Sequence, residues 1–115
     1  MANAFWVEFS IADGLDADEV DKVMDEHMDF MGDRNCTSHG APCEKLAWKE
    51  LVYNADGKDL SEEDREAVIE HLSGHDLITE YRVGDFVMYE DAEEDAIKML
   101  KESIIRYFTS EESEE

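Results

Sequence analysis

Two cysteines and a histidine form the only group in the sequence with the character of a metal site, in the pattern Cys36-x2-His39-x3-Cys43. Zinc prefers thiolate sulfur and imidazole nitrogen, and a structural zinc site holds four such ligands in a tetrahedron. One of the remaining histidines could supply the fourth ligand. However, common zinc signatures pair their ligands as Cys-x2-Cys or His-x3–5-His, and this spacing matches neither. We therefore prefer an ordinary loop without metal, and we expect no cofactor.

A second possibility is a calcium loop at 54–57, Asn-Ala-Asp-Gly, followed by Glu63. Placing Gly57 at the sixth position of an EF-hand loop and Glu63 at the twelfth puts Val52 at the first position. A valine side chain cannot bind calcium, so this interpretation fails. The segment predicts a turn that leads into a helix, with Ser61 as the N-cap.

Acidic residues at Asp91, Glu93, Glu94 and Asp95 could pair as catalytic carboxylates. They stand at the start of an expected helix, where acids are common because the helix dipole is positive there. The sequence indicates no pocket that would raise the pKa of one of them, which general acid catalysis requires. It also contains no phosphate-binding glycine loop, nucleophile elbow or Cys-His-Asn arrangement. We expect a protein that is not an enzyme.

Aromatic residues suggest contact rather than catalysis, since tryptophans often anchor protein interfaces. The candidate partner-binding residues are Trp6 and Trp48, each with a charged neighbour, Glu8 and Lys49. For both tryptophans, a place in the core or under a helix remains the preferred interpretation. His27, on the apolar face of an expected helix, is interpreted as a core histidine with a partner.

Composition describes one folded domain with an unusual charge. The 115 residues are 43% hydrophobic, and 32 acids against 10 Lys and Arg give a net charge of −22. Such a charge repels DNA and anionic membranes and attracts basic protein surfaces. Salt adaptation, solubility and a simple acidic tail are alternative causes. Two cysteines make no disulfide framework, and neither a basic leader nor an apolar run of spanning length is present, so we expect a cytoplasmic protein.

Hydrophobic periodicity gives the elements that position these residues. We expect strands at 4–11 and 46–53, a long bent strand or a hairpin at 77–89, and helices at 16–31, 61–72 and 91–108, with a loop at 33–44 that could hide an edge strand. Asp16 and Glu19 have the spacing of a capping box. This order predicts an α+β fold, a ferredoxin-like βαββαβ sandwich with an added C-terminal helix. The expected single domain is 1–108, and 109–115 is expected to be a disordered acidic tail.

An ordered series of motifs resembles the YggL family, small proteins associated with the large ribosomal subunit. The series comprises FWVEF, GLDADEVDKVMDEHMDF, LAWKELV, SEEDREAVIEHL and VGDFVMYED, and it covers about 5–91. Members usually begin with a basic arm, whereas residues 1–4 here contain no Arg or Lys. The helix 91–108 extends beyond the usual end of the family.

The resemblance and the charge together predict a non-enzymatic YggL-like protein. We expect it to bind the large ribosomal subunit or a ribosomal protein through its acidic surface, because a basic protein suits this charge better than RNA. The alternative hypothesis is an acidic nucleic-acid mimic that inhibits a basic DNA-binding enzyme. The proteins that copurify with the chain would separate the two. The sequence leaves the oligomeric state open.

Overall fold

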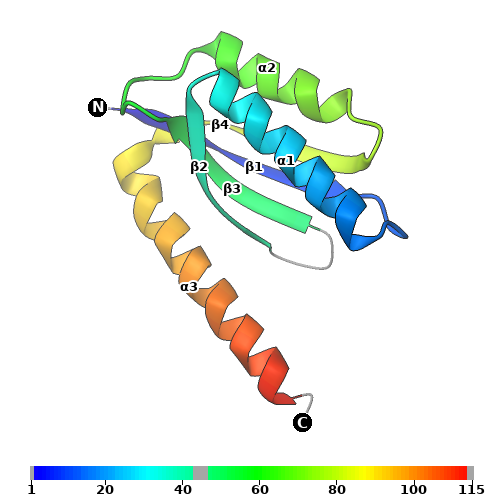
Figure 1. Ribbon diagram of the computed structural model, residues 1–115. Coiled ribbons are helices and arrows are strands. Elements are labelled where there is room, and N and C mark those ends of the chain that lie inside the picture. The colour runs from blue at the N-terminus through cyan, green and yellow to red at the C-terminus, as the bar shows by residue number, and fades with distance from the viewer. Residues whose placement is uncertain (1, 43–46, 114–115) are drawn as a thin grey trace.

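Four strands and three helices follow one another along the chain in the computed structural model, which describes residues 2–42 and 47–113 (Figure 1). Their bounds are β1 Asn3–Ile11, α1 Ala17–Asp33, β2 Cys36–Pro42, β3 Ala47–Asn54, α2 Glu62–Ser73, β4 Ile78–Met88 and α3 Tyr89–Ser113. The expected strands and helices are therefore present, with ends shifted by a few residues. The segment 33–44 does contain an edge strand, β2.

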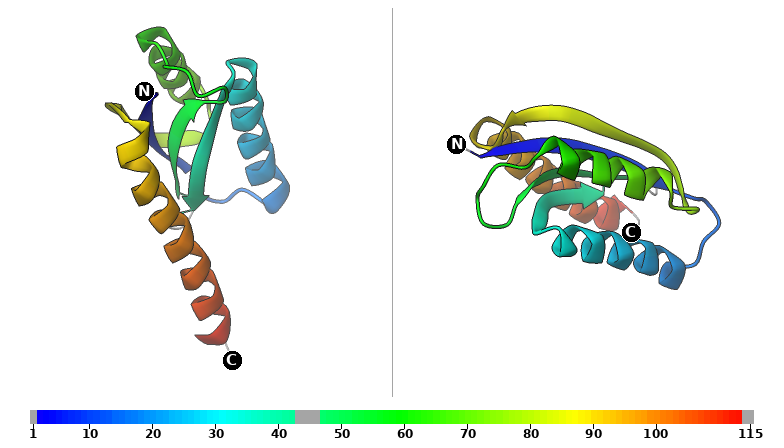
Figure 2. Two further views of the ribbon diagram at one scale, coloured as in Figure 1. Left: turned by 90° about the vertical axis from the view of Figure 1, so that its left-hand side faces the viewer. Right: turned by 90° about the horizontal axis from the view of Figure 1, so that it is seen from above.

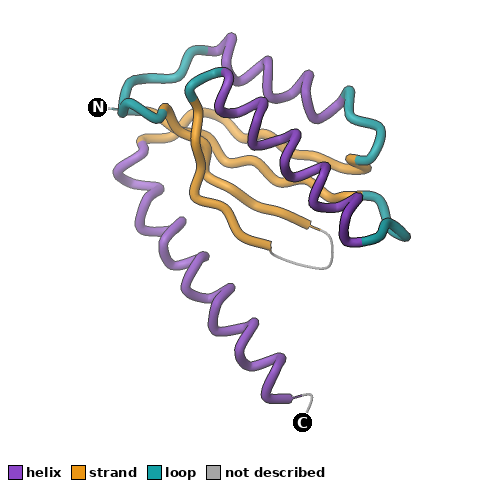
Figure 3. The backbone as a smooth tube through the Cα atoms, in the orientation of Figure 1, coloured by secondary structure: helices purple, strands orange, loops and turns teal. Residues whose placement is uncertain are grey.

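The strands form one antiparallel sheet in the order β2-β3-β1-β4 (Figure 3). β1 and β3 lie in its centre and carry its most apolar residues, whereas β2 and β4 are its edges. This arrangement confirms an α+β fold with a four-stranded antiparallel sheet.

Helices cover both faces of the sheet, because the side chains of each strand alternate between the faces. On β1, Phe5 and Val7 face the layer formed by α1 and α2, and Ala4 and Trp6 face α3. Figure 2 shows these helices on opposite sides of the strands. The larger core contains Phe5, Val7, Phe9, Ile11, Val23, Met31, Cys36, Val52, Leu60, Val68, Leu72 and Ile78. The smaller core under α3 contains Ala4, Leu51, Ala92 and Ala96.

Capping boxes begin both helices of the larger layer. The Asp16 side chain accepts from the backbone N–H of Glu19, and the Glu19 side chain accepts from the N–H of Asp16. Ser61 and Asp64 form the same exchange at the start of α2. Each box satisfies N–H groups that have no partner inside the helix. Both N-termini therefore lie where the sequence predicts them.

α3 begins directly after β4, and Tyr89 donates its N–H to the carbonyl of Ala2 at 3.0 Å. The helix starts before the expected 91 and continues beyond the expected 108, so 109–113 belong to it. Residues 114–115 lie outside the described residues. The division into a domain 1–108 and a tail 109–115 stays a prediction.

Candidate functional site

A histidine and a glutamate are paired in the larger core. The Nε2 atom of His27 on α1 lies 2.5 Å and 3.0 Å from the two carboxylate oxygens of Glu50 on β3. Both side chains are fully buried. Because an unpaired carboxylate in an apolar core is very costly, each residue needs the other. This confirms the interpretation of His27 as a core histidine with a partner.

Glu50 was not singled out from the sequence, although a signal for it exists. Trp48, Glu50 and Val52 alternate along β3, so they share the face that packs against α1 and α2. A glutamate between two inward-facing apolar residues is expected to point into the core. A histidine on an apolar helix face is the complementary signal.

Two further histidines continue from this pair towards the surface. The ring of His71 on α2 stacks on Phe30 at 4.2 Å between centroids and lies 5.4 Å from the ring of His27. His75 follows, and its Nε2 lies 2.9 Å from a carboxylate oxygen of Glu26. Burial, with the charges of His27 and His75, lowers the pKa of His71 to about 4. His71 is therefore neutral at neutral pH, and its ring connects α2 to Phe30 of α1.

Cys36 and His39, two of the three candidate zinc ligands, do not converge. Cys36 is buried in the larger core, whereas His39 faces the other side of β2 and its Nε2 lies 2.9 Å from the Tyr89 hydroxyl. Residues three apart on a strand point to opposite faces, which makes a shared metal impossible here. Cys43 lies outside the described residues, and within those residues no group of three or more His, Cys, Asp or Glu could hold a metal. Burial raises the pKa of the Cys36 thiol, so this cysteine is also a poor nucleophile.

Three of the four candidate partner-binding residues lie together on the face that α3 partly covers. The Lys49 ammonium is 5.2 Å from the ring centroid of Trp6 and 3.6 Å from a carboxylate oxygen of Glu8. Trp6 packs against the smaller core, so it lies beside α3 as its strand position predicts. A cation over an indole face and an exposed ion pair are each weak, so these contacts hold the three side chains together only loosely.

Trp48 lies on the opposite face, packed against the larger core and over Gly40 of β2. A Cβ built on Gly40 would stand 2.5 Å from the Cζ2 atom of the Trp48 ring. The glycine therefore allows the indole to lie flat against the edge strand. The four candidate residues thus do not form one site.

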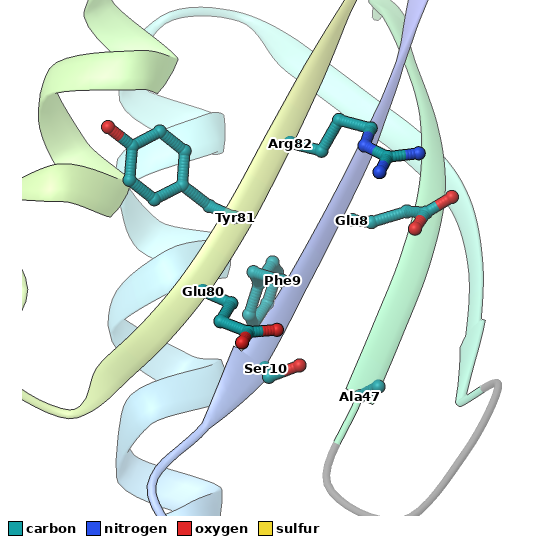
Figure 4. Close-up of a pocket in the computed structure, with 7 residues that line it drawn as sticks. All are labelled: Glu8, Phe9, Ser10, Ala47, Glu80, Tyr81 and Arg82. Atoms are coloured by element: carbon teal, nitrogen blue, oxygen red, sulfur yellow. The ribbon is translucent and has the colours of Figure 1, made fainter.

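A shallow hollow of about 140 Å³ lies on the open part of the second face, next to Glu8 and Arg82 (Figure 4). Figure 4 shows Glu8, Ser10 and Glu80 on the same side of the strands as Arg82, with Tyr81 turned away. Neighbouring β1 and β4 residues bring these groups together, since Glu8 pairs with Arg82 and Ser10 with Glu80. The hollow mixes both charges and contains no buried titratable group, so its geometry suits contact rather than acid–base chemistry.

Carboxylates are concentrated on the outer sides of α1 and α2. The exposed acids of α1 are Asp18, Glu19, Asp21, Asp25, Glu26, Asp29 and Asp33, and those of α2 are Glu62, Glu63, Glu66 and Glu70. Basic residues on these helices are few, and Arg34 and Arg65 are engaged with Asp64 and Glu62. The helix layer therefore presents a mostly unneutralised acidic surface.

Together, these elements form a small α+β protein with a four-stranded antiparallel sheet. The chain belongs to the family described as YggL 50S ribosome-binding protein, whose model matches residues 3–90. The resemblance seen in the sequence is thereby confirmed. The matched region ends where α3 begins. A comparison with individually curated proteins gives no match.

In the described part of the chain, no helix combines the length and the apolar character needed to cross a membrane.

Proposed function

We propose that this protein is a non-enzymatic binding protein that docks on the large ribosomal subunit, or on one of its proteins, through its acidic surface. The observation that carries the proposal is membership of the YggL 50S ribosome-binding protein family over residues 3–90. A ribosomal partner would place the protein in the cytoplasm.

The charge supports a protein partner on the ribosome over RNA. A net charge of −22 opposes approach to phosphate backbones. The same charge accelerates and orients encounters with basic protein surfaces. Within this proposal both faces of the sheet contain candidate contacts. Trp6, Glu8 and Lys49 lie on the face that α3 partly covers, and Trp48 lies on the face that α1 and α2 cover.

We also infer that the body is a ferredoxin-like sandwich. The element order β1-α1-β2-β3-α2-β4 and the sheet order β2-β3-β1-β4 support this inference. In such a sandwich α1 and α2 lie on one face and leave the other open. Here α3, outside the family match, packs on part of that second face. α3 therefore covers part of the second face, and it does not cover the face on which α1 and α2 pack.

Sedimentation of native cell extract tests the docking. The tagged full chain should travel with large-subunit fractions at low salt and leave them at high salt, because contacts between exposed charges are screened. A tag-only control sets the background. Absence from large-subunit fractions at low salt would contradict the proposal. Capture of a nuclease, repair or restriction enzyme instead of ribosomal proteins would favour the nucleic-acid mimic.

A further inference from the structure

A groove runs between the C-terminal half of α1 and β2, the outer strand of the sheet. Its volume is about 320 Å³, and Met28, Met31, Gly32, Ser38, Gly40 and Trp48 are among the residues that line it. The side chain of Met28 is large, apolar and 42% exposed. The exposed thioether of Met28 therefore lies beside the edge strand β2, with the groove between them.

The outer edge of β2 has backbone groups with which no strand in the described part of the chain pairs. Ala55 donates its N–H to the carbonyl of Asn35 on the β3 side. Because backbone groups alternate in direction along a strand, those of Ser38 and Gly40 point away from β3. The carbonyl of Pro42, two residues further, accepts from the Ser103 hydroxyl at 3.5 Å, which agrees with this alternation. Among the described strands, none pairs with this edge.

The residues around that edge leave room for the side chains of another strand. Gly32 has no side chain and nothing within 4 Å of where a Cβ would stand, and Ser38 has a small side chain, whereas the Trp48 ring fills the space over Gly40. Met28 is flexible and polarisable, so it can adapt to an apolar stem laid against it. Pro42 has no N–H, which limits pairing to the part of β2 that precedes it.

The charge beside the groove selects a basic occupant. Asp21 and Asp25 stand seven and three residues before Met28, so they share its side of α1, and both are exposed. The last turn of α1 contains no basic residue. A Lys or Arg of an added strand could lay its stem on Met28 and place its charged head near Asp21 and Asp25.

We propose that this groove binds an extended basic segment of a partner protein, which adds to β2 as a fifth strand. Backbone hydrogen bonds to Ser38 and Gly40 give affinity, and the alternating basic side chains give specificity. The inference rests on the proposed function for the class of partner, a basic protein, and it names the face and the form in which that partner binds.

A synthetic probe tests the groove independently of the ribosome. The probe is a nine-residue peptide of alternating Arg and Val with blocked ends, added to the ¹⁵N-labelled full chain. We expect the amides of Ser38 and Gly40 to shift and to gain protection from hydrogen exchange. The matched peptide with Glu in place of Arg should leave both amides unchanged. The proposal is overturned if the Arg peptide does not bind, or if the protected amides lie on β4 or α2.

Two sets of variants locate the contacts. Ser38→Pro removes an outward N–H that the sheet does not use, so it should abolish binding of the peptide. The Asp21→Asn, Asp25→Asn pair should weaken binding about threefold for each charge removed. The matched pair Glu66→Gln, Glu70→Gln on α2 makes the same charge change away from the groove and should leave binding within about twofold. Equal weakening by both pairs would overturn the proposal, and this comparison decides if Ser38→Pro does not fold.

The outcomes for the groove and for the ribosome are separable. If the parent chain does not sediment with large subunits but the peptide binds as described, the proposed function fails and the groove stands. If the parent sediments with large subunits but the peptide does not bind, the groove fails and the proposed function stands. A concentration-dependent dimer that Ser38→Pro abolishes would show that a second copy occupies the edge, which overturns the proposal.

Discussion

Burying the side chains of His27 and Glu50 removes two polar groups from water, which carries a large desolvation cost. Each is fully buried, and each is the hydrogen-bond partner of the other. In a medium that solvates charge poorly, the pair is tolerable only while it is complete. It is a requirement for specific packing of α1 on β3 rather than a source of net stability.

Replacing one partner should therefore be worse than replacing both. We expect Glu50→Met to lower the free energy of unfolding by about 3–5 kcal/mol, because His27 loses its acceptor in the core. The double variant His27→Leu, Glu50→Met should recover most of that loss, since both polar side chains of the pair are then replaced by apolar ones. Urea denaturation followed by circular dichroism measures both. The exposed Glu80→Met is the control, and a single Glu50 variant no less stable than this control would refute the argument.

Two glycines make a matched test of packing at the groove. Gly40→Ala should cost about 1–3 kcal/mol, because the new Cβ would meet the Trp48 ring at 2.5 Å and force it to move. Gly32→Ala places its Cβ in open space within α1 and should stabilise by up to about 1 kcal/mol. Thermal melts and the tryptophan emission spectrum measure the two effects. Equal stability of the two variants would contradict the packing described for Trp48.

At the scale of elements, the histidine row makes the contact between α1 and α2 sensitive to acid. The pKa of His71 is near 4 in the folded protein and 6.5 in its ordinary state. The unfolded chain therefore binds a proton more readily, so stability is intact above pH 6.5 and is lost progressively as the pH falls towards 4.

His71→Phe should remove this loss while keeping the stack on Phe30. Between pH 7 and pH 4, the parent should lose about 2–3 kcal/mol more than the variant, a figure reduced from the full shift because the ring is partly accessible. The other titrating groups are common to both proteins. The difference between the urea midpoints of the two proteins, followed from pH 7 to pH 4, therefore reports the contribution of His71 alone. Parallel pH profiles for the two proteins would show that His71 does not titrate as described.

Most elements could be predicted from the sequence because their signals are local. Alternation defines β1 and β3, and Asp16 and Ser61 fix the starts of α1 and α2. The sequence of β2 predicts a loop that could hide a strand, because its residues have poor strand propensity and pairing with β3 supplies the missing stability. α3 begins at Tyr89, two residues before the expected start at 91, because the chain passes from strand to helix there without a turn residue that would mark the boundary.

The candidate sites were less predictable, because they depend on which residues far apart in sequence become neighbours. Trp6, Glu8 and Lys49 meet because β1 pairs with β3, and the register that joins them is a property of the sheet. Cys36 and His39 looked like a cluster along the sequence, but the strand sends them to opposite faces. Their separation could be predicted only once 36–42 was known to be a strand.

For the whole molecule, the distribution of charge follows the two helix layers. The outer sides of α1 and α2 are acidic, whereas the second face mixes Lys49 and Arg82 with acids. A partner that is basic protein can approach the helix layer, and RNA is repelled from it. The proposed docking on the large subunit depends on this difference in charge between the outer sides of α1 and α2 and the second face.

Binding of the labelled full chain to purified large ribosomal subunits tests the central claim most directly. The account predicts binding to intact large subunits at low salt that weakens steeply as ionic strength rises, with much weaker binding to protein-free ribosomal RNA. Equal affinity for protein-free ribosomal RNA, or no binding to large subunits at low salt, would contradict it.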